Sequence, residues 1–184
     1  LPMGAMYAAD LFGMALFSLM QVRLGQVDGA TTQIVVMLTS IAYMPGVGLA
    51  LAGTTLVGQA IGAGDHDWAR RLGNAVIAVT MGYMGAVGVV LAVLGPWLMP
   101  FFVSAGDPQA TDVVRLGVVL LWIAAGYQLF DGLQLGSGFA LRGAGDSFPG
   151  LVSTMVTRAV VAVALAYILA FPLGLGSLGV WIAL

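Results

Sequence analysis

The sequence predicts an all-α membrane protein. Of its 184 residues, 60% are hydrophobic, and only six are basic and eight acidic. A soluble domain would carry charge on roughly a quarter of its residues. The mean hydropathy of +1.04 agrees with this deficit. The composition therefore excludes a soluble globular protein, a nucleic-acid-binding protein and a disordered segment. Because the chain has no cysteine, it also excludes disulfides and thiolate metal sites.

The charged residues fall in clusters, and long apolar runs separate the clusters. A helix needs about 20 apolar residues to cross a bilayer, and these runs are long enough. These runs are continuous rather than alternating, which argues against barrel strands. We expect helices at about 2–23, 30–62, 67–95, 108–141, 149–171 and 178–184. Both ends of the chain lie inside apolar runs, so we expect a fragment of a larger membrane protein, five full spans and the start of a sixth.

Glycine and proline mark the expected helix ends. Gly62 and Gly64 can adopt the left-handed conformation that ends a helix, and Asp65 or Asp67 can then cap the next one. Pro45 should kink the second helix. Gly95-Pro96 and Pro100 are expected to end the third helix early, and Pro108 and Pro149 suit first helical turns.

Arginine placement suggests an orientation. With alternating spans, loops 62–71 and 142–149 share one side of the membrane. That side holds Arg70, Arg71 and Arg142, and the other holds Arg23 and Arg115. The positive-inside rule therefore favours loops 62–71 and 142–149 as cytoplasmic.

Three charged residues, Asp10, Asp131 and Arg158, lie inside predicted spans. A charge at the bilayer centre costs at least about 2.5–3.5 kcal/mol, so each must face protein or a water-filled cavity. Counted at about 1.5 Å per residue, all three fall near the midplane. Tyr43 reaches the same depth, and Tyr127, Asp131 and Gln134 share one helix face.

Carboxylate and phenol oxygens suit a hard cation. We therefore interpret Asp10, Asp131, Tyr127 and Tyr43 as a site for H⁺ or Na⁺, with Na⁺ bound at the two carboxylates. The alternative is structural: either aspartate could pair with Arg158 and simply hold the bundle together.

Two GxGD sequences, at 62–65 and 143–146, resemble the motif of intramembrane aspartyl proteases. Such enzymes need two aspartates that share a proton within the membrane. Both copies fall in predicted loops, so an aspartate-capped glycine turn is the better interpretation.

His66 has no partner histidine or cysteine nearby in the sequence and is not expected to bind metal. Nothing else indicates an enzyme.

Methionines accompany the intramembrane charges. Met6 and Met14 flank Asp10 at helical spacing, and Met37 lies on the second predicted helix. Flexible thioethers suit a cavity for varied apolar compounds, to which Gln134 and Arg158 could contribute. They suit ordinary membrane packing equally well.

The longer motifs resemble the multidrug and toxic compound extrusion (MATE) transporters. They are the stretch from Pro45-Gly46 through Gly58-Gln59-Ala60 to Asp65, the stretch from Tyr127-Gln128 through Asp131 to Arg142-Gly143-Ala144-Gly145-Asp146, and the ending Leu178-Gly179-Val180-Trp181. The pattern is similar to the C-terminal lobe of the NorM-type branch, helices seven to eleven and the start of twelve.

The resemblance implies half of a twelve-helix antiporter whose two six-helix lobes are related by pseudo-twofold symmetry. Such transporters export amphipathic, often cationic drugs in exchange for Na⁺ or H⁺, without another cofactor. The family acid in helix seven is usually Glu, so Asp10 would be a shorter substitute at the same spacing from Pro2. Tyr127 and Asp131 match family positions, and Arg158 does not.

The expected partners are therefore small organic substrates, the coupling ion, the bilayer of a bacterial inner membrane and the N-terminal lobe. A lipid-linked oligosaccharide flippase of similar architecture remains an alternative, although a single Arg158 offers little charge for pyrophosphate. A purely structural membrane subunit is another.

Overall fold

The computed structural model describes residues 11–13, 15–17, 19, 25–103, 108–145, 163–170 and 176–182, and the regular elements among them are all helices. Three helices are long: α2 (Gln26–Gly62), α3 (His66–Leu98) and α4 (Ala110–Gly143). The short elements are the 3₁₀ helix η1 (Met99–Phe102), α6 (Val163–Ala170) and α7 (Gly176–Ile182). α2, α4 and the segment His66–Phe102 are each long and apolar enough to cross a membrane.

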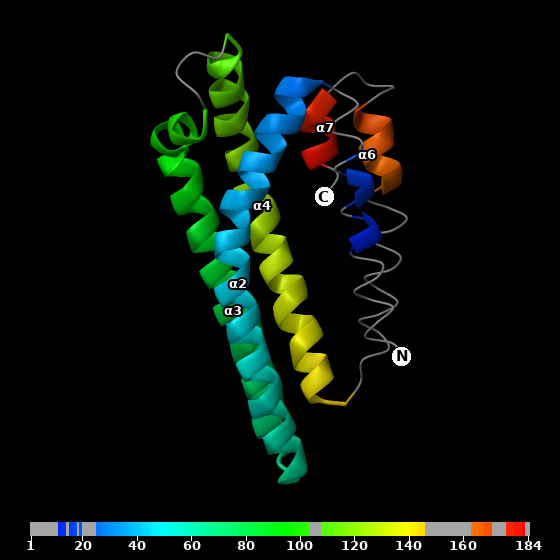
Figure 1. The fold of residues 1–184 in the computed structure, drawn as a ribbon. Helices are drawn as coiled ribbons and strands as arrows, with labels where there is room; N and C mark the ends of the chain where they lie inside the picture. The colour runs from blue at the N-terminus through cyan, green and yellow to red at the C-terminus, as the bar shows by residue number, and fades with distance from the viewer. Residues whose placement is uncertain are drawn as a thin grey trace.

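The three long helices pack side by side, with α6 and α7 beside them on the right in Figure 1. Two contacts show that α2 and α4 run in the same direction. The Thr54 hydroxyl donates to the Phe139 carbonyl over 2.9 Å, and Gln128 Nε2 donates to the Thr39 carbonyl over 3.5 Å. The α2–α3 turn and the end of α4 therefore lie at the same end of the bundle, as the predicted alternation of spans requires.

Glycines bring the backbones of α3 and α4 into contact. A Cβ atom at Gly132 would lie 2.9 Å from the Met81 Cα, and one at Gly136 would lie 2.8 Å from the Ile77 Cα. Close approach through small residues is the usual way in which membrane helices associate, because lipid offers no hydrophobic drive for larger side chains to meet. This packing accounts for part of the high glycine content.

Helix α7 docks on the amino-terminal part of the bundle through one tryptophan. The Trp181 ring meets the Phe17 ring edge to face, with centroids 5.5 Å apart. Its Nε1 donates to the Thr32 hydroxyl over 3.3 Å, so the indole is buried with its polar atom satisfied. Val35, Leu120 and Val180 are also fully buried in this cluster.

Some helix boundaries differ from those expected. α2 begins at Gln26 rather than at residue 30, because Asp28 is accommodated in its first turn, where the helix dipole favours an acid. α4 begins at Ala110 rather than 108 and ends at Gly143 rather than 141. α7 begins at Gly176. Of the expected helix 149–171, the described part is Val163–Ala170.

The expected early end of the third helix at Gly95-Pro96 is wrong. The Met99 N–H bonds to the Gly95 carbonyl, so the helix passes through Pro96 to Leu98 and tightens into η1, with Pro100 in its first turn. Proline removes one backbone hydrogen bond, and membrane helices tolerate this where local 3₁₀ adjustment and neighbouring helices compensate. Pro45 likewise lies inside α2, which changes direction along its length in Figure 1.

The two Gly-Ala-Gly sequences form the same turn. Ala63 and Ala144 each donate a backbone N–H to the carbonyl four residues earlier, and Gly64 and Gly145 follow with φ of 78° and 85°. Gly62, which was expected to be left-handed, is instead the last residue of α2. The Asp65 carboxylate accepts the Trp68 N–H over 2.9 Å and caps α3.

Candidate functional site

The structure describes five of the predicted site residues. They lie on two helices: Tyr43 and Met37 on α2, and Tyr127, Asp131 and Gln134 on α4. Asp10, Met6, Met14 and Arg158 fall outside the described residues. The arrangement of the predicted Asp10–Asp131 pair and the alternative pairing with Arg158 therefore stay predictions.

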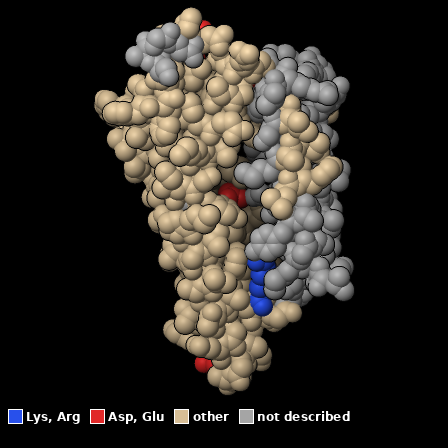
Figure 2. Space-filling model, in the orientation of Figure 1, with Lys and Arg blue, Asp and Glu red and all other residues tan. Residues whose placement is uncertain are grey.

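Asp131 is a buried carboxylate in the membrane-spanning part of α4. Its side chain is only 6% exposed, and it lies about 32 Å along the helix from Ala110 and about 18 Å from Gly143. Figure 2 shows acidic atoms at about mid-height of the drawn face, away from the acidic atoms near its two ends. A buried charge at this depth must be compensated within the protein, which marks the position as a candidate ion site.

Tyr43 lies at the level of Asp131 on the neighbouring helix. The Thr39 carbonyl contacts Gln128, and a Cβ atom at Gly46 would lie 3.8 Å from Leu135. Because α2 and α4 run parallel, Tyr43 sits between these two contacts on α2, just as Asp131 does on α4. The structure thus brings a phenol-bearing and a carboxylate-bearing residue to one depth on adjacent helices.

Tyr127 and Gln134 extend this polar region along α4. They precede and follow Asp131 by one helical turn and are half-buried. On α2, Tyr43 is 41% and Met37 60% exposed. Met37 is two residues from Thr39, whose carbonyl contacts α4, so it lies on a different side of α2 and is not brought to the face that meets Gln128 and Leu135.

Gln128 is a polar residue that the sequence reasoning passed over. Its side chain is 1% exposed; Nε2 reaches the Thr39 carbonyl on α2, whereas Oε1 has no hydrogen-bond partner among the described residues. Thr80 on α3 is also fully buried, and its hydroxyl has no partner within the described ranges. The signal that could have found Gln128 is its position three residues before Asp131, which places the two as neighbours on the helix surface.

Within the described ranges, no group of three or more His, Cys, Asp or Glu side chains is gathered as a multidentate metal site would require. The described polar side chains at this level of α2 and α4, those of Tyr43, Tyr127, Gln128 and Gln134, carry phenol and amide oxygens rather than carboxylates. Such a set suits a weakly held monovalent cation or a proton better than a tightly bound divalent metal.

Comparison with known proteins identifies this architecture. The MatE family model matches residues 2–168. The chain belongs to the MatE family. The chain is 30% identical over 181 residues to the probable multidrug resistance protein NorM of Rhizobium meliloti and 32% identical to that of Agrobacterium fabrum. Each alignment includes 98% of this chain, and the chain spans 39% of the length of each relative.

Solved structures show the same fold. The chain superposes with a TM-score of 0.86 on a MATE crystal structure in complex with MaD3S, at 18% identity. It superposes with a TM-score of 0.76 on an outward-facing multidrug resistance MATE transporter of the MOP superfamily, at 19% identity. Each match covers 99% of this chain and 39% of the other. The described helices are therefore those of a six-helix lobe, half of a MATE-type transporter, in an integral membrane protein.

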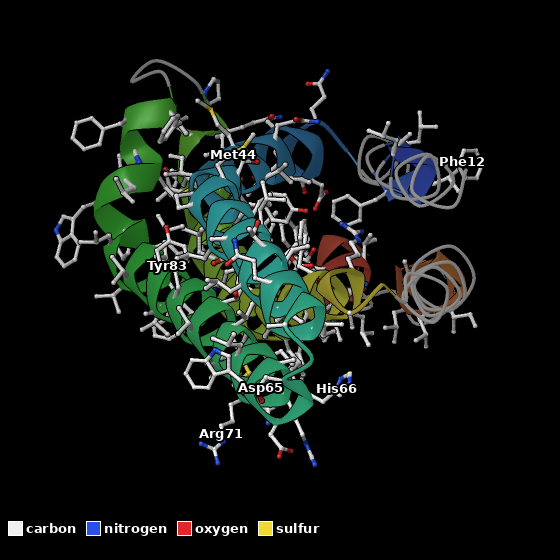
Figure 3. All side chains as sticks on the ribbon, turned by 90° about the horizontal axis from the view of Figure 1, so that it is seen from below. Phe12, Met44, Asp65, His66, Arg71 and Tyr83 are labelled. Carbon is white, nitrogen blue, oxygen red and sulfur yellow. The ribbon has the colours of Figure 1, made fainter. Side chains whose placement is uncertain are left out.

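The GxGD turns of this MatE chain do not resemble a protease site where they are described. Asp65 is exposed and caps α3, and Asp65, His66 and Arg71 all lie at the end of the bundle that faces the viewer in Figure 3. An exposed aspartate at a helix start has a structural role that needs no catalysis. Asp146 of the second copy lies outside the described residues.

Proposed function

We propose that this chain is part of a multidrug efflux transporter that exports amphipathic, often cationic organic compounds in exchange for Na⁺ or H⁺. Membership of the MatE family and the NorM relatives support export of small organic compounds. The buried Asp131, about 18 Å inside the cytoplasmic-side end of α4, is the single observation that carries the coupling step. The protein would act in a bacterial inner membrane, with loops 62–71 and 142–149 in the cytoplasm and a second lobe completing the cavity.

Asp131 would bind the coupling cation, with Tyr127 and Tyr43 adding phenol oxygens. Asp10 would supply a second carboxylate from the first helix. A cation that neutralises Asp131 removes the cost of an intramembrane charge, so its arrival and departure can bias the two lobes between inward-open and outward-open states. A cationic drug competes for the same carboxylates, and this competition would make the exchange obligatory.

The test is transport by the complete transporter in liposomes under separate Na⁺ and H⁺ gradients. We expect Asp131→Asn and Asp10→Asn each to abolish gradient-driven drug flux while the protein remains folded. Asp112→Asn is the matched control, because Asp112 lies in the exposed first turn of the same helix, and it should transport normally. Normal flux in both Asp131→Asn and Asp10→Asn would rule out coupling through these carboxylates.

A further inference from the structure

Gln128 is held inside the bundle at an energetic cost that the packing alone does not explain. The side chain is 1% exposed, and its Oε1 has no hydrogen-bond donor in the part of the chain that the structure describes. A buried acceptor without a donor is destabilising, whereas an apolar side chain of the same shape would incur no such cost. A buried amide oxygen of this kind points to a binding role for Gln128.

The amide bridges two neighbouring helices. Nε2 donates to the Thr39 carbonyl on α2 over 3.5 Å, at the upper limit for a hydrogen bond. Oε1 points to α3, where a Cβ atom at Gly88 would lie 2.9 Å from it. The same Cβ would lie 3.4 Å from the Ala125 carbonyl oxygen, so two oxygens, both hydrogen-bond acceptors, border the Gly88 notch.

Rotation of the amide by a half turn would exchange these two atoms. Nε2 would then enter the Gly88 notch beside the Ala125 carbonyl, an acceptor. Oε1 would move to the α2 side, beside the Thr39 carbonyl and one turn from the Asp131 carboxylate. Two carbonyl oxygens brought together repel each other unless a cation lies between them, and oxygen donors of this kind coordinate the coupling ions of other transporters.

Other charge is scarce around this position. Tyr83 is the one ionisable side chain between residues 72 and 102, which belong to α3 and η1. Tyr43 is the one ionisable side chain between residues 29 and 62 of α2. On α4 between 116 and 141, Tyr127 and Asp131 are the ionisable groups. Asp131 is thus the group on these three helices that can attract a cation to the level of Gln128.

We propose that Gln128 is a ligand of the coupling cation. When the cation binds at Asp131, the amide turns so that Oε1 and the Thr39 carbonyl both face the ion; when the cation leaves, Nε2 returns to the Thr39 carbonyl. With Na⁺ the two carbonyls coordinate the metal, and with H⁺ the Gln128 oxygen accepts a hydrogen bond from the protonated Asp131 carboxyl, which keeps the proton. This inference rests on the proposed function, since it assumes that Asp131 loads a cation.

The test measures cation binding and stability separately in the complete transporter. Gln128→Leu removes the oxygen while keeping the volume, and Gln128→Glu keeps an oxygen donor. Cation binding to the folded state raises the melting temperature. We expect Gln128→Leu to melt no lower than wild type without the cation, but to lose the cation-induced rise in melting temperature, and to raise the half-saturating cation concentration for transport by about tenfold or more.

The Gln128→Glu variant should retain the cation-induced rise. Gln33→Leu, at an exposed glutamine on α2, is the control and should behave as wild type. Measuring the melting temperature against Na⁺ concentration at fixed pH, and then against pH without Na⁺, identifies which cation Gln128 binds. A Gln128→Leu protein with wild-type cation response would overturn the proposal, whichever ion drives transport.

Two further results keep the outcomes separable. If Asp131→Asn and Asp10→Asn both retain coupled transport, the proposed coupling through these carboxylates itself fails. If Gln128→Leu does not fold, the comparison passes to Gln128→Glu and Gln128→Met, both able to fill the same space. A cation response in Gln128→Met equal to that in Gln128→Glu would overturn the ligand role, and a loss confined to Gln128→Met would support it.

Discussion

The side-chain oxygen of Gln128 on α4 occupies the space that a Cβ atom at position 88 of α3 would need. The ideal Cβ would lie 2.9 Å from this oxygen and 3.1 Å from the Ala125 Cα. Glycine at position 88 therefore permits both the helix contact and the position of the amide. Several other glycines of the bundle have comparable, separately testable roles.

Gly88→Ala should destabilise the transporter by about 1–3 kcal/mol, because the added methyl group overpacks a close helix contact. In a Gln128→Ala background the same substitution should cost at least about 0.5 kcal/mol less, since the oxygen that it meets is gone. Equilibrium unfolding in mixed micelles measures both. Gly82→Ala, on the same helix with open space around it, is the control. Equal costs in the two backgrounds would show that the oxygen does not occupy the Gly88 notch.

Gly136→Ala should weaken the α3–α4 contact more than an alanine substitution at a neighbouring glycine where the added methyl group has free space. Its Cβ would lie 2.8 Å from the Ile77 Cα, so the backbone must move, at a cost of about 1–3 kcal/mol. Gly138→Ala places its methyl group in open space and should be neutral or slightly stabilising, because alanine favours helix. Thermal melting of the two purified variants distinguishes them, and indistinguishable melting temperatures would contradict the backbone contact.

Trp181→Phe should cost about 1 kcal/mol through loss of the hydrogen bond to the Thr32 hydroxyl, while the ring contact with Phe17 is kept. A double-mutant cycle with Thr32→Val should show coupling, because either single change removes the same bond. Trp97→Phe, at a tryptophan that is 65% exposed, serves as the control. Strictly additive costs of Trp181→Phe and Thr32→Val would argue against the bond.

Asp65→Ala should lower stability by about 1 kcal/mol, because the Trp68 N–H loses the carboxylate that caps α3. Asp65→Asn and Asp65→Ser retain a capping oxygen and should restore most of that loss. Asp67→Ala removes an exposed acid from the same turn and should cost less. Chemical unfolding of the four variants gives the ranking, and a larger loss for Asp67→Ala would place the cap elsewhere.

Gly64→Ala should cost about 1–2 kcal/mol although no atom lies near the added methyl group, because φ is 78° and the left-handed region disfavours a Cβ atom. Gly62→Ala, two residues earlier, adds its methyl group in equally open space but at the helical end of α2. That variant should be neutral or stabilising. The difference in melting temperature between the two alanine variants measures the cost of placing a Cβ atom on a left-handed residue. Equal melting temperatures would contradict the turn geometry.

The sequence by itself determined the fold class, the approximate spans and the position of Asp131 within one of them. It could do so because lipid imposes a simple rule: charged residues concentrate at helix ends, and those that do not are conspicuous. The Asp65 cap and the turn at Gly64 also followed from local chemistry, since both depend on residues adjacent in the chain. The continuation of α3 through Pro96 did not follow, because neighbouring helices override a local helix breaker.

Only the tertiary structure decided which residues meet across helices. The parallel register of α2 and α4, which brings Tyr43 level with Asp131, depends on contacts between residues separated by 85 or more positions along the chain. The burial of Gln128 and its unpartnered oxygen depend on the same packing. A glutamine near an aspartate is unremarkable in sequence; it becomes informative when three helices enclose it and leave one of its atoms without a partner.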